Sequence, residues 1–468
     1  MDLKSLKSHL RVPHTFVIIF GIVILVAILT YIIPAGEFDR ATDPETGITT
    51  VVPNSYHRIP QSPIGFLGLF KSVQLGMIDA AQIIFFVFIV YASFYIIIKS
   101  GAFNAFIGAL LKSIKGKEIW MIPLSMYAFS LGGATFGMAE ETYGFIPIFI
   151  GLAIALGYDA IVGLCMVFLS VVIGFTAAPL NPFTVGIAQT IAELPLFSGM
   201  GFRAIGFLIF TTIAVVYTMR YANKIKKNPE KSFVKDLDFG EFSLHREDLL
   251  KTKLTFRHKL IMLVVLIIIG VEVYGVTNLG WYIDELAGLF LIMGIVCGLI
   301  AGYTPSKIAE IFLEGCADVV FGALIIGLAR SILIVMSAGH ITDTIIWGLA
   351  EPLTYLSQWA SAEAMLGIQT IINFLIPSGS GQAVVTMPIM VSLADLADVN
   401  RQVAVLAFQC GDGLSNLLWP TAAIAVVSGI AKIPIQRWWR FFLPLLAIMF
   451  VTQMAYIGLA CFIDLGPF

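Results

Sequence analysis

The sequence predicts an all-α polytopic membrane protein, built as an inverted repeat with two re-entrant hairpins and two broken transmembrane helices. Its 468 residues are 58% hydrophobic and only 12% charged, with a mean hydropathy of +0.92. A soluble domain carries about 25% charged residues, so this composition indicates a chain that crosses a membrane many times. Two further observations give the architecture: paired polar interruptions within apolar segments, and a charge pattern that inverts between the halves.

The first apolar run, Thr15 to Pro34, predicts a retained membrane helix. It has the roughly 20 residues that a crossing needs, and no small-residue cleavage site of the signal-peptide type follows it. The loop 37–63 is acidic and rich in turn formers, whereas the loop 220–259 is basic. Basic segments stay in the cytoplasm, so we expect a multi-pass protein of the cell inner membrane with loop 37–63 outside. The amino terminus is then cytoplasmic, as its basic residues also indicate: Lys4, Lys7 and Arg11.

The stretch from Gly132 to Gly144 contains two adjacent carboxylates, Glu140 and Glu141, between apolar runs that carry no charge. A carboxylate in hydrocarbon is costly, so this glycine-broken segment must be wrapped in protein or face a watery cavity. Its arms, Ile119 to Phe136 and Tyr143 to Leu156, fall near or below the roughly 20 residues of a full crossing. We therefore predict the tip of a re-entrant hairpin that enters from the cytoplasm. Two tilted full spans are the alternative.

Two later segments read as broken helices. The run Ala160 to Gln189 is interrupted between Thr176 and Thr184 by two prolines, which remove helical donors and open the backbone. Freed carbonyls there are expected to ligate a cation or the substrate. The run Val403 to Ile430 is interrupted from Gly411 to Pro420. A second hairpin, Ile371 to Leu393, precedes it and is expected to enter from outside.

The two halves follow one order: span, amphipathic helix, hairpin, proline-broken span and closing span. Short matches, such as Lys99 to Gly101 with Ser337 to Gly339, are offset by about 240 residues, and the hairpins enter from opposite sides, as in an inverted-topology transporter. The alternative is a shared helical pattern with coincidental prolines. Paired interruptions at corresponding positions indicate a binding site near the middle of the membrane.

The candidate binding residues differ between the hairpins. Glu140 and Glu141 would neutralise a cationic group or exchange a proton, with a structural ion pair as the alternative. Arg330 would pair with a buried acid, Asp412 among them, or receive a substrate carboxylate through its planar fork. The second tip offers hydroxyls, an amide and backbone donors that suit a carboxylate, unless its glycines serve only tight packing: Ser378, Gly379, Ser380, Gly381 and Gln382.

The helix breaks add oxygen ligands of the hard type that a sodium ion prefers: Thr176, Asn181 and Thr184 in the first, Asp412, Ser415 and Asn416 in the second. Because one hairpin presents acid and the other presents hydroxyls and amides, together they complement a molecule with a positive and a negative end. An amino acid fits that description.

Four motifs resemble the C4-dicarboxylate anaerobic carrier family, in particular its YfcC-like basic amino acid antiporter branch. They are Val12 to Val17, Tyr31 to Phe38, Gly137 to Thr142 and Ile376 to Gly381. The resemblance spans essentially the whole chain. It implies a scaffold domain, a mobile transport domain, an elevator mechanism and usually a homodimer, and it adds Thr142 to the expected site. The expected divisions are 1–118 scaffold, 119–201 transport domain, 202–361 closing helix and second scaffold, 362–436 transport domain, and 437–468 closing helix.

Charge favours a cationic amino acid such as arginine, ornithine or lysine as the substrate. Two negative charges placed beside Glu140 and Glu141 would cost several kcal/mol unless those acids were protonated or paired. A sodium- or proton-coupled C4-dicarboxylate transporter is the alternative, and the coupling ion, Na⁺ or H⁺, is left open.

The sequence gives no indication of an enzyme, a cofactor or a metal site. It contains no nucleotide-binding loop, Ser/His/Asp arrangement or metal spacing of histidines and cysteines. A net charge of -2 favours no nucleic acid partner. A channel is the remaining alternative class, but paired breaks favour gated carriage. The expected partners are a small amino acid and the lipid bilayer.

Overall fold

The computed structural model describes residues 14–42, 49–52, 54–113, 117–240, 242, 249 and 251–466. The basic residues Lys4, Lys7 and Arg11, on which the predicted orientation partly rests, lie outside these ranges, as do Lys115 and Arg246. So does the start of the motif from Val12 to Val17.

Seven helices in the described residues are long and apolar enough to cross a membrane, which makes the chain a multi-pass membrane protein. The first coincides with the predicted retained helix. Its apolar side chains Leu25 and Ile28 are 54% and 52% exposed, as expected of a helix that faces lipid. The seven are α2 (Thr15–Ile32), α4 (Ala81–Lys99), α11 (Met200–Lys227), α13 (Phe256–Leu279), α14 (Ile283–Ala301), α15 (Pro305–Ala338) and α21 (Ile435–Phe462).

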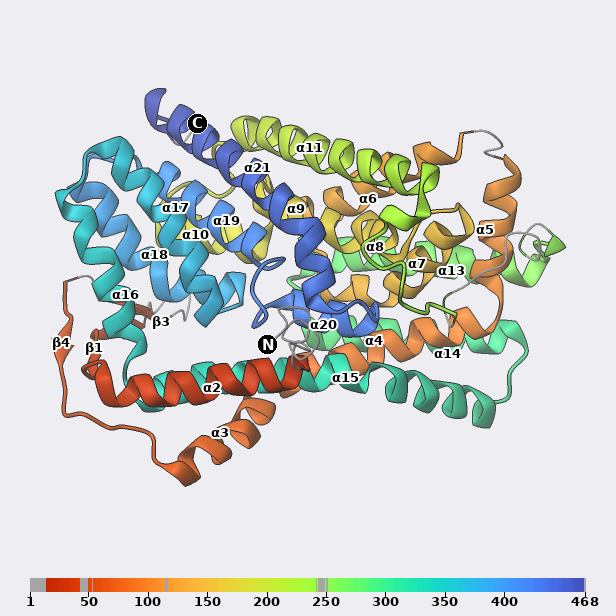
Figure 1. Cartoon of the computed structure of the whole chain (residues 1–468), viewed down its shortest axis with the longest axis horizontal. Coiled ribbons are helices and arrows are strands. Elements are labelled where there is room, and N and C mark those ends of the chain that lie inside the picture. The colour runs from red at the N-terminus through yellow and green to blue at the C-terminus, as the bar shows by residue number, and fades with distance from the viewer. Residues whose placement is uncertain are drawn as a thin grey trace, which may run out of the picture.

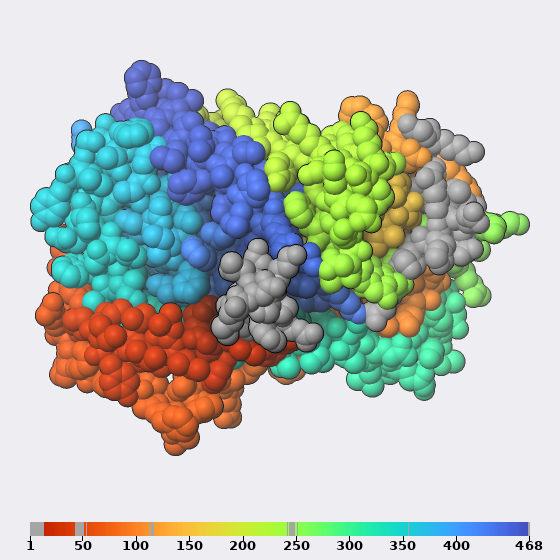
Figure 2. Space-filling model, in the orientation of Figure 1, coloured from red at the N-terminus to blue at the C-terminus, as the bar shows by residue number. Residues whose placement is uncertain are grey.

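Helix α15 runs along one side of the molecule, where it packs against α2, α4 and α3 (Phe66–Asp79) (Figure 1). On the opposite side, α11 and α21 run over the surface together (Figures 1 and 2). The shorter helices fill the space between these two sides. The amphipathic helices of the two halves are α5 (Ala102–Ser113) and α16 (Thr342–Ala350), and they lie at opposite ends of the molecule (Figure 1).

Two helical hairpins occupy the predicted positions. The first hairpin consists of α6 (Met121–Thr135), the 3₁₀ turn η2 (Glu140–Phe145) and α7 (Ile146–Ala155). The second hairpin consists of α17 (Gln358–Leu375) and α18 (Gly379–Leu396). All four helices are shorter than the roughly 20 residues of a full crossing. Their entry from opposite sides of the membrane, and the inverted repeat, stay predictions.

Both predicted interruptions are present. In the first broken helix, α8 (Ala160–Leu164), η3 (Cys165–Leu169) and α9 (Ser170–Thr176) end before the two prolines, and the chain resumes as η4 (Pro182–Gly186) and α10 (Ile187–Ile191). Asn181 starts the second half, because its Oδ1 accepts from the backbone N–H groups of Phe183 and Thr184 at 2.9 and 3.2 Å. The second broken helix is α19 (Arg401–Ser415) followed by α20 (Ala423–Ile430).

Three boundaries differ from the sequence prediction. Helix α15 begins at Pro305, whereas the apolar run begins at Val319, because Thr304 caps a polar first segment. Helix α11 continues to Lys227 and α13 starts at Phe256, so both ends of the expected loop 220–259 are helical. Short 3₁₀ segments complete the fold: η1 (Glu118–Trp120), η5 (Pro229–Lys231) and η6 (Glu351–Tyr355).

The described chain is mostly helical, as the sequence predicts, but the loop after α2 also forms two small antiparallel sheets, which were not predicted. Strand β1 (Gly36–Glu37) pairs with β4 (His57–Arg58), and β2 (Arg40–Thr42) pairs with β3 (Thr49–Val51). Two- and three-residue strands are too short for an alternating pattern to stand out in the sequence.

Candidate functional site

The two hairpin turns and the two helix breaks line one cavity of about 200 Å³, which we call the hairpin cavity. It collects residues that are more than 270 positions apart in sequence, such as Glu140 and Asn416. Of the residues expected to bind substrate or ions, eight line it: Glu140, Glu141, Thr184, Ser378, Gly379, Ser380, Asp412 and Asn416.

The acidic wall of the hairpin cavity is set by the turn that follows α6. Gly137 has φ +79°, and a Cβ at this position would collide with the ring of Phe183, which lies in η4 of the first broken helix. Only glycine allows this conformation and this approach without strain. The turn places Glu140 and Glu141 at the cavity, where the N–H of Ala139 donates to Glu141 Oε2 at 2.7 Å. No lysine or arginine of the described residues lines the hairpin cavity.

The opposite wall is the start of α18. Ser378 caps this helix, its Oγ accepting from the N–H of Gly381 at 3.3 Å. Gly379 lies so close to the first broken helix that a Cβ would stand 2.7 Å from Thr184 Cγ2 and 3.1 Å from Asp412 Oδ2. The glycine therefore allows both breaks to meet the second tip, and the partial positive charge of the helix start faces the cavity.

An oxygen-rich corner surrounds Asp412. Asn373 of α17 donates through Nδ2 to Asp412 Oδ1 at 2.8 Å. Within the described part of the chain, Asn373 Oδ1 and the neighbouring Thr184 Oγ1 are buried without a hydrogen-bond partner. Carboxylate, amide and hydroxyl oxygens form the ligand set of a hard cation, so this corner is where a coupling ion would fit chemically.

Five of the expected site residues do not line the cavity and instead hold the backbone. Asn181 Nδ2 donates to the carbonyl of Gly133 at 2.8 Å, and Gln382 Nε2 donates to Gln369 Oε1 at 2.6 Å. The hydroxyls of Thr142, Thr176 and Ser415 donate to carbonyls within their own turn or helix. Gly381 lines a neighbouring cavity. Apart from Gln382 Oε1, which is buried without a partner among the described residues, these polar groups are satisfied internally, as is required in a membrane.

The expected pairing of Arg330 with Asp412 is wrong. Arg330 Nε binds Asp79 Oδ2 at the end of α3. The expectation that free carbonyls of the first break ligate a cation stays a prediction, and Gln409 Nε2 already bonds one carbonyl before the break and one within it. It donates to Phe175 at 3.2 Å and to Ala178 at 2.9 Å.

Sequence reasoning missed four polar residues in or behind this region. Tyr282, between α13 and α14, lines the hairpin cavity with its ring 5.3 Å from that of Phe183. Asn373 was hidden in an apolar run. Arg203 is fully buried and donates to Gln402 and Gln409. Glu272 is 1% exposed in α13, and both its carboxylate oxygens lack a partner among the described residues. A lone charge inside an apolar run was the available signal for Glu272.

Two relatives are similar to this chain over nearly its full length. A protein of Escherichia coli (strain K12), provisionally named the basic amino acid antiporter YfcC, is 35% identical over 481 residues, covering 94% of each chain. An uncharacterized protein of Haemophilus influenzae (strain ATCC 51907 / DSM 11121 / KW20 / Rd) is 31% identical over 493 residues, covering 95% of this chain and 96% of its own.

Two solved structures are similar at a lower level. The Alcanivorax borkumensis YdaH transporter covers 96% of this chain and 98% of its own at 15% identity, with a TM-score of 0.43. Neisseria gonorrhoeae MtrF, titled as illuminating a class of antimetabolite efflux pumps, covers 97% and 96% at the same identity and TM-score. Similarity at this level does not establish a shared fold.

The model of the DcuC family, the C4-dicarboxylate anaerobic carriers, matches residues 12–461. Together with the two relatives of more than 30% identity, this match covers both hairpins and both broken helices. The chain is therefore a transporter, not an enzyme, and it belongs to the C4-dicarboxylate anaerobic carrier family.

Proposed function

We propose that this protein exchanges or imports a cationic amino acid, such as arginine, ornithine or lysine, across the cell inner membrane. The hairpin cavity is its central site. An elevator movement of the hairpins and broken helices against α2, α4 and α15, in a homodimer, would expose the site to each side in turn. The amino terminus would lie in the cytoplasm.

The proposal rests mainly on the charge of the hairpin cavity. Glu140, Glu141 and Asp412 line it, and no basic side chain of the described residues does. Three carboxylates in a space of about 200 Å³ repel one another, so a bound cation lowers the free energy of the site. The start of α18 with Ser378 and Ser380 supplies donors for the carboxylate of the same molecule. The name of the E. coli relative agrees with this substrate class.

The second candidate is sodium- or proton-coupled C4-dicarboxylate transport. The oxygen-rich corner at Asp412 favours it, because Thr184 Oγ1 and Asn373 Oδ1 are buried there without a hydrogen-bond partner among the described residues. The description of the family agrees with this substrate class. A bound cation would offset part of the acidic charge and admit a dicarboxylate at the donors of the second hairpin.

Transport in proteoliposomes separates the two candidates. The first arm measures entry of labelled arginine into vesicles loaded with ornithine, against vesicles loaded with buffer. The second measures entry of labelled succinate under an inward sodium or proton gradient. Arginine entry that depends on internal ornithine supports exchange. Gradient-driven succinate entry without arginine flux would overturn the proposal and favour the second candidate.

A further inference from the structure

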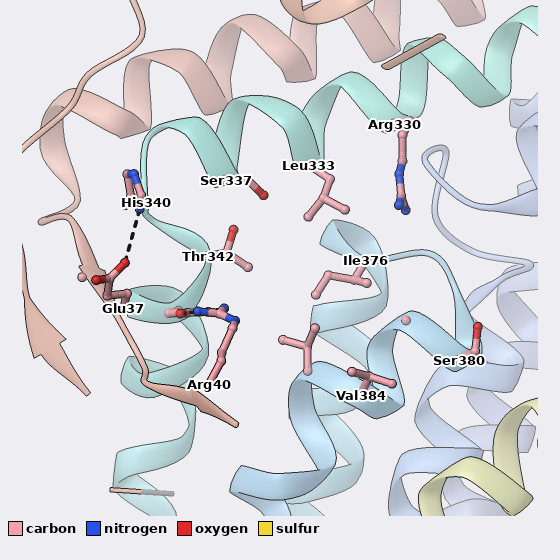
Figure 3. Close-up of a pocket in the computed structure, with 14 residues that line it drawn as sticks. Glu37, Arg40, Arg330, Leu333, Ser337, His340, Thr342, Ile376, Ser380 and Val384 are labelled. Carbon is pink, nitrogen blue, oxygen red and sulfur yellow. Dashed lines mark hydrogen bonds and ion pairs between the residues drawn. The ribbon is translucent and has the colours of Figure 1, made fainter. Parts of the chain in front are cut away.

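A second and larger cavity, of about 600 Å³, adjoins the hairpin cavity on the side of β1 and β2. We call it the vestibule. Glu37 and Arg40 of the strands, Arg330 and Leu333 of α15, and Ile376 and Val384 of the second hairpin face it (Figure 3). In the predicted topology this end of the molecule is external.

Arg330 lies where the vestibule meets the binding region. It lines the vestibule and also a third space of about 180 Å³, the junction cavity, which is lined in addition by Glu140 and Ser378. Figure 3 shows the Arg330 side chain extending from α15 toward the hairpin that carries Ser380. Ser380 in turn lines both the vestibule and the hairpin cavity. Arg330 and Ser380 therefore both lie where a solute would move from the vestibule toward the acidic site.

The two arginines of the vestibule differ in their free donors. Arg40 Nη2 binds both carboxylate oxygens of Asp343 at 3.0 and 2.9 Å, and its Nη1 donates to the carbonyl of Phe38 at 3.2 Å. Arg330 binds Asp79 through Nε alone. Its two terminal nitrogens form no hydrogen bond within the described part of the chain, so a planar fork faces the cavities.

The junction cavity thus contains one positive and one negative end. Arg330 supplies the fork and is paired through Nε with Asp79, which lines the same cavity, while Glu140 supplies a carboxylate without a basic partner there; apolar side chains, Ile83 and Ile326 among them, complete the lining. A planar guanidinium with two free donors binds a carboxylate in a bidentate manner. A cavity of about 180 Å³ holds a single small molecule.

We propose that Arg330 receives the α-carboxylate of the amino acid together with the start of α18, where Ser378 lines the same junction cavity, and directs its cationic side chain to Glu140. Arg330 is then the residue that distinguishes an amino acid from the corresponding amine. This assignment rests on the proposed function, and it adds the orientation of the substrate and the basis of its selection.

The test compares arginine with agmatine, which has the same guanidinium chain and lacks the carboxylate. In the full-length protein in proteoliposomes, we expect arginine to be preferred over agmatine by about tenfold or more, because a donor fork without its carboxylate is left unpaired. Arg330→Lys keeps a cation for Asp79 and loses the fork. It should lower the ratio of arginine to agmatine transport toward one.

Arg40→Lys is the matched control, since this arginine faces the same vestibule with both of its terminal nitrogens already bonded. It should keep the preference for arginine. A general folding defect would lower the transport of arginine and of agmatine equally. Arg330→Gln therefore serves as a second variant, and it is judged on the same ratio of arginine to agmatine transport. An unchanged ratio in both Arg330 variants, with arginine still transported, would overturn the assignment. Absence of arginine transport in the natural protein would instead overturn the proposed function.

Discussion

Asn373 and Asp412 tie the second hairpin to the second broken helix. The amide Nδ2 of Asn373 in α17 donates to Asp412 Oδ1 in α19 at 2.8 Å, and both side chains are buried. The bond leaves Asp412 Oδ2 beside Gly379, at the tip of the same hairpin. A movement of the second hairpin relative to α19 would therefore act directly on Asp412, which lines the hairpin cavity.

Replacing Asn373 by leucine should destabilise the protein. The change leaves the buried Asp412 without its donor, which costs about 1 to 3 kcal/mol. We expect a lower midpoint of thermal unfolding in detergent. Asn278→Leu is the control, because Asn278 is exposed at the end of α13 and bonds only within its own turn. Equal midpoints for the two variants would contradict the importance of this bond.

The two hairpin glutamates should be required for a cationic substrate. In the variant with glutamine at both Glu140 and Glu141, arginine uptake should fall by about a hundredfold, since the charge that offsets the cation is lost. Glu363→Gln is the control: Glu363 in α17 is a carboxylate without a hydrogen-bond partner among the described residues, and it lines none of the three cavities. Full arginine uptake in the double variant would remove these acids from the site.

Gly379→Ala should slow transport by about tenfold or more while leaving the fold intact. The added methyl group would stand 2.7 Å from Thr184 and 3.1 Å from Asp412, so the tip must move away from both breaks. A displacement of this kind costs about tenfold or more in rate. Gly367→Ala, in α17 with open space around it, should be tolerated and stabilise the helix by up to about 1 kcal/mol. Similar uptake in the two variants would show that the tip is loosely packed.

Glu272→Met should raise stability and lower transport. An unpartnered carboxyl group buried in a membrane helix costs about 1 to 3 kcal/mol, which an apolar side chain of similar size removes. Natural proteins keep such a cost mainly where function needs the group. The midpoint of thermal unfolding and the exchange rate measure the two effects. A lower midpoint would show that Glu272 has a stabilising partner.

Lowering the pH on the side of the membrane where β1 lies should weaken substrate binding. His57 lies 3.6 Å from Glu37 and 4.0 Å from Asp39. Its hydrogen bond to the Ser55 carbonyl and these two acids raise the pKa of His57. As pH falls through that pKa, His57 becomes charged and pairs with Glu37, whose other oxygen faces His340 at 3.8 Å. The apparent KM for external arginine should therefore rise as pH is lowered from about 8 to about 6.

His57→Gln should flatten this part of the pH profile, because the positive charge that competes with arginine for Glu37 is then absent. His258→Gln is the control, since His258 lies at the start of α13, away from the vestibule. A profile that keeps its full slope in His57→Gln would assign the pH dependence to another group.

Much of the architecture follows from local sequence. The apolar runs predicted the membrane helices, the prolines between Thr176 and Thr184 predicted the first break, and Glu140 and Glu141 marked the first tip. These signals are local because helix length, missing donors and the cost of charge in hydrocarbon depend only on neighbouring residues. The polar start of α15 and the small sheets escaped detection, since capping and short strand pairs leave little periodic signal.

The tertiary structure alone decided which polar residues meet. Asn181 and Gln382 had the same appearance in the sequence as Thr184 and Ser380, yet the first two hold backbone and other side chains while the second two face cavities. Arg330 pairs with Asp79, which is more than 240 residues away in sequence, and not with Asp412. Such pairings depend on helix rotation and on the meeting of distant segments. Sequence by itself determined that costly polar groups are buried in this membrane protein, and only packing decided which partner satisfies each of them.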